Sequence, residues 1–350
     1  MSSQRLKSST ARARERGGAV KSILMFLLFL LVVCVLTFGA GGYFAYREAN
    51  RPGPLTDDVV VTLEKGASVR AISETLSENN VIRHPELFVA ITRLKDAASA
   101  LKAGEYRIPA EISTWDLVDL LVEGKSILHY FTAAEGLTTA QIIKAISDDP
   151  ILVGDVTLSP DEGALLPETY AFTRGQTRDQ MLTTLMKAQE TLLADVWEER
   201  AVELPFSTPE EAITLASIVE KETGVASERS RIAAVFVNRL KKGMRLESDP
   251  TIIYGLTGGE PLGRGLRVSE IKRETPYNTY VIRGLPPTPI ANPGKDAIEA
   301  VLNPDDTSEI FFVADGSGGH AFAETLADHN RNVARWREIE RQRKAEAGAP

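Results

Sequence analysis

The sequence has a single cysteine, Cys34, and only four histidines among its 350 residues. Cys34 lies within a long apolar run near the N-terminus, so no disulfide can form within the rest of the chain and a disulfide scaffold is excluded. The histidines are His84, His129, His320 and His329, and no two of them are spaced as a zinc-binding pair on one helical turn. We therefore expect no metal site and no catalysis by a cysteine nucleophile.

Signatures of several other enzyme classes are also missing. The sequence contains no Gly-x-Ser-x-Gly elbow of a serine hydrolase, and no glycine-rich phosphate loop follows a predicted strand. The net charge is -8 and no basic stripe occurs beyond the first residues, which argues against nucleic acid as a partner. We expect no cofactor, and the chemistry that remains is that of carboxylates.

The longest apolar run of the chain lies near the N-terminus. Residues 23–45 carry no charge and no proline, and about 20 such residues cross the core of a bilayer as a helix. Residues 1–22 carry six basic side chains and one acidic side chain, so the positive-inside rule keeps this tail in the cytoplasm and exports the rest of the chain. A cleaved signal peptide is the competing interpretation because residues 39–42 are small, but the run is longer than the apolar part of a typical signal peptide. We therefore predict a retained single-pass transmembrane helix.

Residues 51–150 are predicted to form a small α+β region. A short strand is expected at Val59–Leu63 and a returning strand at Gly104–Ile108. Between them, apolar residues at helical spacing predict two helices, the first capped by Ser68 and the second at Pro85–Leu94. Strand, helix, helix and strand in this order are typical of a LysM-like module. A generic α+β subdomain without affinity for carbohydrate is the alternative.

Residues 151–335 are predicted to form a mixed α/β domain, followed by a charged tail at residues 336–350. Apolar residues at helical spacing predict several helices, and the one over residues 208–224 begins with a capping Thr208 and a proline at its first position. The predicted fold class is therefore α+β: a single transmembrane helix, a small LysM-like subdomain and a mixed α/β catalytic domain.

Two carboxylates, Glu220 and Glu222, lie at the end of this apolar helix. At about 100° per residue, Glu220 falls beside Ile213 and Glu222 falls beside Leu215, so both lie at the margins of the apolar face. A partly desolvated carboxyl group has a raised pKa and can act as a general acid near neutral pH. Ordinary salt bridges to nearby basic residues are the alternative, and helix geometry does not choose between the two glutamates.

Polar and aromatic residues on the loops downstream are candidates for binding a sugar chain. Tyrosine, asparagine, aspartate and histidine side chains on rigid loops suit hydroxyl and acetamido groups, although the same residues could simply pack the loops. The candidates are Asn238, Asp249, Tyr254, Tyr277, Asn278 and His320.

Six segments of the second domain follow one another in a distinctive order. They are Ala216-Ser-Ile-Val-Glu-Lys-Glu-Thr223, Phe236-Val-Asn-Arg-Leu240, Gly243-Met-Arg-Leu-Glu-Ser-Asp-Pro-Thr251, Tyr277-Asn-Thr-Tyr280, Gly284-Leu-Pro-Pro287 and Phe312-Val-Ala-Asp-Gly-Ser-Gly-Gly-His320. Together they resemble the signature of the endolytic murein transglycosylases, the MltG or YceG-like family. The transmembrane helix and the LysM-like region fit the same family. Glu247 departs from the family pattern, in which glutamine is expected.

The resemblance implies a reaction and a set of residues. It implies cleavage of the β-1,4 bond between N-acetylmuramic acid and N-acetylglucosamine in nascent peptidoglycan, with attack by the muramyl 6-hydroxyl and formation of a 1,6-anhydro end. The family's catalytic glutamate maps onto Glu220, which would serve as acid and then as base. Glu222 then becomes a structural residue or a substrate contact, and Asp249 a substrate contact.

The resemblance also implies partners and a location. The partners are peptidoglycan glycan strands and peptidoglycan synthases, and cleavage would terminate strand elongation. The location is the bacterial inner membrane, with a cytoplasmic N-terminus and a periplasmic catalytic domain. Two other functions stay open: a muramidase in which water attacks and Glu222 or Asp249 is the second carboxylate, and a non-catalytic membrane-anchored scaffold that binds peptidoglycan.

Overall fold

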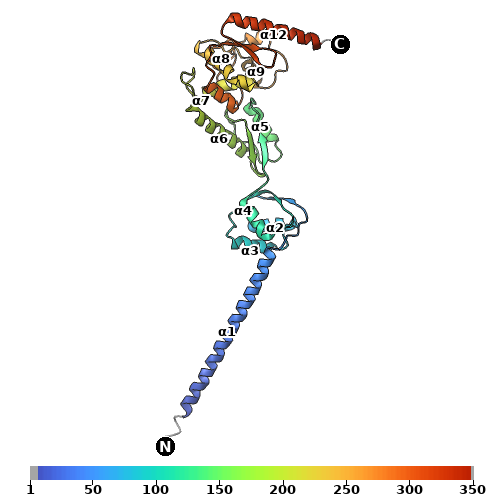
Figure 1. Cartoon of the computed structure of the whole chain (residues 1–350), viewed down its shortest axis with the longest axis vertical. Coiled ribbons are helices and arrows are strands. Elements are labelled where there is room, and N and C mark those ends of the chain that lie inside the picture. Colours follow the sequence, from blue (N-terminus) through green and yellow to red (C-terminus); the bar gives the residue numbers. More distant parts are fainter. Residues whose placement is uncertain (1–6, 348–350) are drawn as a thin grey trace. The chain divides into compact units, whose positions relative to one another are not determined.

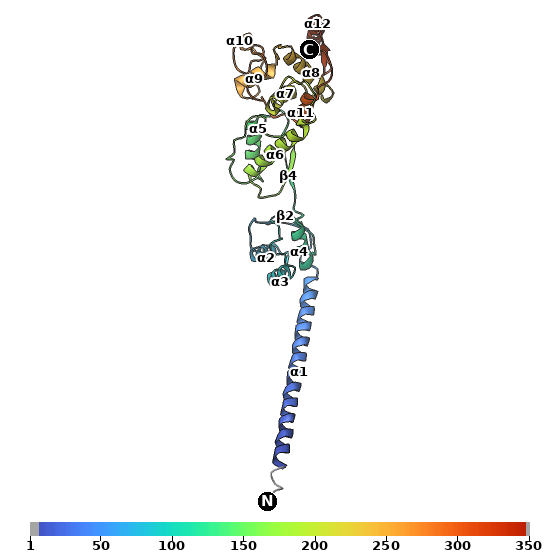
Figure 2. The same cartoon turned by 90° about the vertical axis from the view of Figure 1, so that its left-hand side faces the viewer.

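The computed structural model describes residues 7–347, which form two compact units that divide between Ile127 and Leu128 (Figure 1, Figure 2). The sequence placed residues 128–150 with the first unit. Strand β3 (His129–Thr132) pairs with β4 (Thr169–Phe172) in an antiparallel ladder. This pairing ties the segment after Leu128 to the second unit, so the division falls earlier in the chain than the sequence indicated.

Helix α1 (Lys7–Ala49) contains the apolar run (Figure 1). Its part from Leu24 to Ala49 contains an 18-residue stretch with a mean hydropathy of 2.7 and is long and apolar enough to cross a membrane. The large apolar side chains of this part are exposed, Phe38 to 81%. An apolar surface of this kind needs a non-aqueous environment, so α1 is a candidate membrane span and the predicted apolar helix is confirmed.

The rest of the first unit contains the predicted strands and helices. Strand β1 (Val59–Leu63) pairs antiparallel with β2 (Gly104–Ile108), and helices α2 (Val69–Glu78) and α3 (Pro85–Leu94) lie between them in the chain. Ser68 caps α2 by accepting a hydrogen bond from Ala71 N at 3.2 Å. A further helix, α4 (Thr114–Glu123), completes the unit, and its core includes Leu76, Phe88, Tyr106 and Leu117.

The second unit has two apolar cores. The first lies among β3, β4, α5 (Thr139–Asp148) and the N-terminal half of α6 (Arg178–Trp197). The second lies among α7 (Pro209–Glu222), α8 (Arg229–Lys241) and α11 (Lys295–Leu302). Thr208 and Glu211 form a capping box at the start of α7. All eight residues of α7 from Ala212 to Val219 are buried, including the polar Thr214 and Ser217, so this helix is enclosed on all sides and not only along one apolar face.

Shorter elements surround the second core. The 3-10 turn η1 (Ala226–Glu228) leads into α8, while α9 (Asp249–Thr257) and α10 (Val268–Ile271) lie in the long segment before α11. Strand β5 (Phe311–Ala314) pairs antiparallel with β6 (His320–Ala323), and α12 (Leu326–Ala347) packs against this pair. Residues 336–347, which the sequence placed in a charged tail, therefore continue helix α12. The mixture of helices and strands confirms the predicted α+β class.

Candidate functional site

Helix α7 carries both of the glutamates that the sequence indicated. The helix ends at Glu222, and Thr223 is its C-cap. Two positions that are two residues apart in an α-helix are rotated by about 200° around its axis, so the two side chains point to opposite sides of the helix. Glu220 accepts a hydrogen bond from Gly294, whereas Glu222 accepts one from Ser248. The two carboxyl groups therefore lie in different environments.

Glu222 lies in the wall of a polar cavity of about 410 Å³. The hydroxyl of Ser248 donates a hydrogen bond of 2.5 Å to Glu222 Oε1. Ser248 is buried, and its backbone N–H donates to Thr279 Oγ1 at 3.0 Å. Two of the sequence motifs thus fix the position of this carboxyl group. The cavity is lined by Glu222, Arg239, Leu246, Glu247, Asp249, Tyr280, Phe312 and His329.

The environment of Glu222 favours the protonated carboxyl group. Its pKa is raised to about 6, and burial is the largest cause. The hydrogen bond from Ser248 opposes this rise, the negative charge of Asp249 adds to it, and His320 and Arg239 lower the pKa. A carboxyl group with a pKa in this range can donate a proton near neutral pH and take one back afterwards.

Asp249 and Tyr280 form a second hydrogen-bonded pair in the same cavity. The Tyr280 hydroxyl donates to Asp249 Oδ1 at 2.8 Å. Burial and this hydrogen bond raise the pKa of Tyr280 above its ordinary value, so the phenol stays protonated and remains a donor. The exposed carboxylate of Asp249 keeps acceptor capacity for a ligand.

Arg239 holds the cavity wall together from α8. Its side chain is 9% exposed, and its Nη1 donates to Leu246 O at 3.0 Å and to Glu247 Oε2 at 3.1 Å. Its Nε donates to Ile310 O at 2.7 Å. This cation also pairs with the acid that departs from the family pattern, so the extra negative charge of Glu247 is compensated locally.

Glu220 faces a different set of groups. Its Oε2 accepts a hydrogen bond of 3.0 Å from Gly294 N. Burial raises its pKa, the Gly294 amide opposes this, and the charge of Glu135 raises it further; Arg229 and Lys221 lower it. A Cβ on Gly294 would lie 1.9 Å from Glu135 Oε1, so Glu135 also lies against this glycine. Glu220 is therefore part of a packed contact between α7, α11 and the turn before α5.

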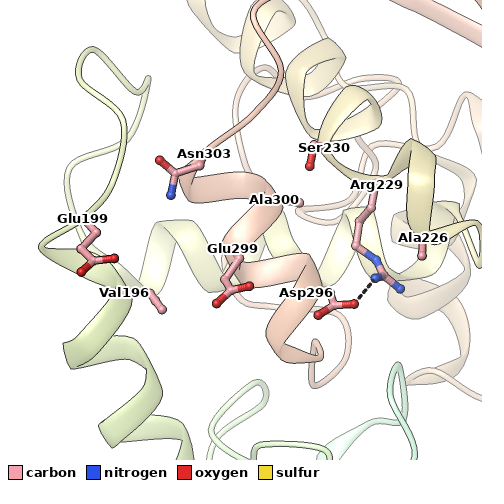
Figure 3. Close-up of a pocket in the computed structure, with 9 residues that line it drawn as sticks. All are labelled: Val196, Glu199, Ala226, Arg229, Ser230, Asp296, Glu299, Ala300 and Asn303. Atoms are coloured by element: carbon pink, nitrogen blue, oxygen red, sulfur yellow. Dashed lines mark hydrogen bonds and ion pairs between the residues drawn. The ribbon is translucent and has the colours of Figure 1, made fainter.

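A second polar cavity, of about 440 Å³, lies beside Arg229 (Figure 3). Arg229 is 8% exposed, and its Nη1 donates to Asp296 Oδ2 at 2.9 Å. The carboxylates of Glu199 and Glu299 also line this cavity. Its lining includes none of the site residues predicted from the sequence, whereas the Glu222 cavity includes two of them. The Glu222 cavity is therefore the candidate active site.

Two of the predicted substrate contacts are engaged in holding loops. Asn238 Nδ2 donates to Thr307 O at 2.6 Å and to Glu309 O at 3.0 Å. Asn278 is 1% exposed, its Nδ2 donates to Ile271 O at 2.9 Å and also to two neighbouring carbonyls, and its Oδ1 accepts from Tyr280 N at 3.0 Å. These contacts favour structural roles: Asn278 fixes the loop that carries Tyr280.

The predicted tyrosines Tyr254 and Tyr277 lie together, with ring centroids 5.1 Å apart. The Tyr254 hydroxyl donates to Glu162 Oε2 at 3.1 Å, and the Tyr277 hydroxyl hydrogen-bonds Thr288 Oγ1 at 2.8 Å. Glu162 and Thr288 line a separate cavity of about 540 Å³ between α6 and α7. The tyrosines thus connect the segments around the candidate site without lining it.

His320 lies at the start of β6. Its Nδ1 is 2.8 Å from Glu228 Oε2, and its backbone N–H donates to Glu228 Oε1 at 3.0 Å. The ring contacts Phe312 edge-on, with centroids 5.3 Å apart, and Phe312 lines the Glu222 cavity. His320 therefore lies behind the cavity wall, close enough to influence the pKa of Glu222.

The raised pKa of Glu222 predicts a measurable effect on stability. Between pH 4.5 and 6 the folded protein binds more protons at Glu222 than the unfolded chain does, so this group lowers the free energy of unfolding as the pH rises through that window. Glu222→Gln, which still accepts from Ser248, is expected to raise the free energy of unfolding at pH 7.5 by about 2 kcal/mol. Denaturant unfolding at pH 7.5 and pH 4.5 checks this. An equal difference at both pH values would contradict it.

The family model and the curated relatives indicate the same family. The model of the YceG-like family matches residues 61–335. An endolytic murein transglycosylase of Bacillus subtilis (strain 168) is 30% identical over 326 aligned positions, which cover 83% of this chain and 89% of that protein. An endolytic murein transglycosylase of Streptococcus pneumoniae serotype 2 is 28% identical, over 89% of this chain and 64% of that protein. The crystal structure of a YceG-like protein from Listeria monocytogenes is 28% identical with a TM-score of 0.49, over 79% of this chain and 98% of that chain.

Proposed function

Because the chain belongs to the YceG-like family, we propose that it is a membrane-anchored endolytic transglycosylase of peptidoglycan. The relatives named above, which it resembles over most of its length, are endolytic murein transglycosylases. The observation that carries the proposal is the Glu222 carboxyl group, which lies in the wall of a polar cavity and has a pKa raised to about 6. It has the properties of a group that acts first as an acid and then as a base.

The proposed reaction cleaves the β-1,4 bond between N-acetylmuramic acid and N-acetylglucosamine. The Glu222 carboxyl gives its proton to the bridging oxygen while the bond from that oxygen to the anomeric carbon breaks. The 6-hydroxyl of the same muramyl residue attacks the anomeric carbon, and its proton passes to the Glu222 carboxylate. A 1,6-anhydro end remains and no water is consumed. One carboxyl group serves both steps, whereas most glycosidases use two.

Glu222 takes the role that the resemblance gave to Glu220. Both have raised pKa values, but Glu222 shares its cavity with Asp249 and Tyr280. A general acid must lie within hydrogen-bond reach of the bond that breaks, and a cavity with further polar groups offers space for the sugar. Glu220 instead holds the Gly294 amide at the start of α11. We assign Asp249 and Tyr280 to the binding of sugar hydroxyl groups.

The location and partners are part of the same proposal. The apolar part of α1 is assigned to a retained span of the bacterial inner membrane, with the N-terminus in the cytoplasm and the catalytic unit in the periplasm. The strand–helix–helix–strand region of the first unit supports a LysM-like module. Residues 151–335 are assigned to the catalytic domain, together with residues 128–150, which belong to the same compact unit. Peptidoglycan synthases are the proposed partners, because cleavage near the membrane would set the length of new strands.

The test is to incubate the full-length protein in detergent with purified uncrosslinked glycan strands and to identify the products by mass spectrometry. Fragments with 1,6-anhydro-muramyl ends, 18 mass units lighter than hydrolysis products because no water is added, are expected. Reducing ends would favour a muramidase with Asp249 as the second carboxylate. Strand binding without any cleavage would favour the scaffold.

A further inference from the structure

His329 lies in the wall of the Glu222 cavity, and the proposed reaction does not use it. It comes from the first turns of α12, and its ring stacks on Phe311 with centroids 4.9 Å apart and an angle of 19°. One basic and three acidic side chains line the same cavity: Arg239, Glu222, Glu247 and Asp249. The histidine thus combines an aromatic packing contact with a place on the surface that would face the sugar.

The two ring nitrogens of His329 have different surroundings. Nδ1 is buried and has no hydrogen-bond partner within residues 7–347. Nε2 is not among the buried unpaired atoms, and His329 lines the cavity, so Nε2 is the ring nitrogen that we assign to contact with a ligand there. A buried polar atom without a partner is unusual, and it bears on which ring nitrogen carries the proton.

The imidazole is neutral at neutral pH. Burial lowers the pKa of His329, the nearby charge of Arg239 lowers it further, and Glu247 opposes both. A neutral imidazole carries one proton, and in protein interiors an orphaned backbone N–H is rarer than an under-satisfied carbonyl. By the same argument we assign the proton to Nε2, which makes that nitrogen a donor and leaves the enclosed Nδ1 as the unpaired acceptor.

We propose that His329 is a substrate-contacting residue of this site, donating a hydrogen bond from Nε2 to an acetamido carbonyl oxygen of the bound sugar. The inference rests on the proposed function. The neighbouring carboxylates Glu247 and Asp249 can only accept hydrogen bonds and suit hydroxyl groups, whereas an acetamido carbonyl needs a donor. A neutral donor also adds no positive charge beside the anomeric carbon, which becomes positive in the transition state.

The test compares two replacements of His329 in the Glu222→Gln protein, which is expected to bind strands without cutting them. His329→Phe keeps a ring to stack on Phe311 but has no donor, and its affinity for uncrosslinked glycan strands is expected to fall about tenfold. His329→Gln lacks the ring but can donate from its amide nitrogen, and is expected to bind within about threefold of the parent. A residue that only packs would give the opposite order, and that order would overturn the inference.

Two further measurements separate this inference from the proposed function. With N-deacetylated strands, in which the acetamido groups are converted to amines, the His329→Phe variant and its parent are expected to bind alike. A tenfold difference that persists would contradict contact with the acetamido group. In the protein with Glu222 intact, His329→Phe is expected to raise KM more than it lowers kcat. If the parent binds strands but the intact protein does not cut them, the proposed reaction fails while the His329 contact is still decided by the binding series. If the parent does not bind strands, the inference fails.

Discussion

Replacing Glu222 by glutamine is expected to lower the rate of glycan-strand cleavage by about a thousand-fold, within the range that a positioned general acid and base contributes. Glutamine has nearly the same shape and can still accept the hydrogen bond from Ser248, so the wall of the cavity should stay in place. It cannot supply a proton to the leaving oxygen or take one from the 6-hydroxyl. The initial rate of release of anhydro-ended fragments measures the effect.

The matched control is Glu220→Gln, two residues away on the same helix. Its amide oxygen can still accept from Gly294 N, and the charge that it removes lies beside Glu135. We expect its rate to stay within about tenfold of the unmodified protein, because Glu220 acts in the packing of α7 and α11. Thermal melting shows whether both variants are folded. If Glu220→Gln abolishes cleavage while Glu222→Gln retains it, the assignment of Glu222 is wrong and that of Glu220 is right.

The sequence predicted the helix of the site but did not choose between its two glutamates. The capping residue Thr208, the apolar spacing and the end of α7 are local features, and all are observed. What separates Glu220 from Glu222 is the group that each one meets across the fold. Gly294 and Ser248 are far from α7 in the chain, and no periodicity within the helix carries that information.

The dependence on distant or folded partners also explains why Asn238 and Asn278, which were predicted to contact substrate, instead hold loops. An asparagine in a polar loop looks the same in sequence whether its amide faces a ligand or main-chain carbonyls. For Asn238 those carbonyls lie 69 and 71 residues further along the chain. For Asn278 they lie only 5 to 8 residues earlier, but the fold of that loop decides whether they meet the amide. Tyr280 and Arg239 line the cavity and were not among the predicted site residues. A signal for Arg239 was present, because a charged residue in the apolar part of a helix normally has a buried partner.

The boundary between the two units is a third feature that the local sequence did not determine. Strand and helix boundaries of the first unit follow from local pattern, and β1, α3 and β2 have the predicted limits. The assignment of residues 128–150 to one unit or the other depends on the pairing of β3 with β4, which joins His129 to Phe172. Such long-range pairing is decided by the sheet partner, so local sequence is a weak guide to it.

Asn292→Asp is expected to destabilise the second unit by about 3–5 kcal/mol at pH 7.5, because it buries a charge without a partner. Asn292 is 0% exposed and joins its own segment to two others, residues 137–139 and 162–165. Its Oδ1 accepts from Leu165 N at 2.9 Å, while its Nδ2 donates to Leu137 O and Thr139 Oγ1, each at 3.1 Å. Nδ2 also donates to Glu162 Oε1 at 3.2 Å. The aspartate keeps the shape of the side chain but loses these donors and places two carboxylates against each other.

The pH dependence separates this charge effect from a general loss of packing. The new carboxyl group is protonated more readily in the folded protein than in the unfolded chain, since burial and Glu162 both raise its pKa. The stability of Asn292→Asp should therefore fall, relative to the unmodified protein, as the pH rises from 5 to 7.5. Asn303→Asp, an exposed asparagine at the C-cap of α11, makes the same chemical change on the surface and should cost less than about 1 kcal/mol. Thermal and denaturant unfolding at the two pH values measure both variants. A deficit for Asn292→Asp that is small, or equal at pH 5 and pH 7.5, would mean that the amide does not hold the three segments through its donors.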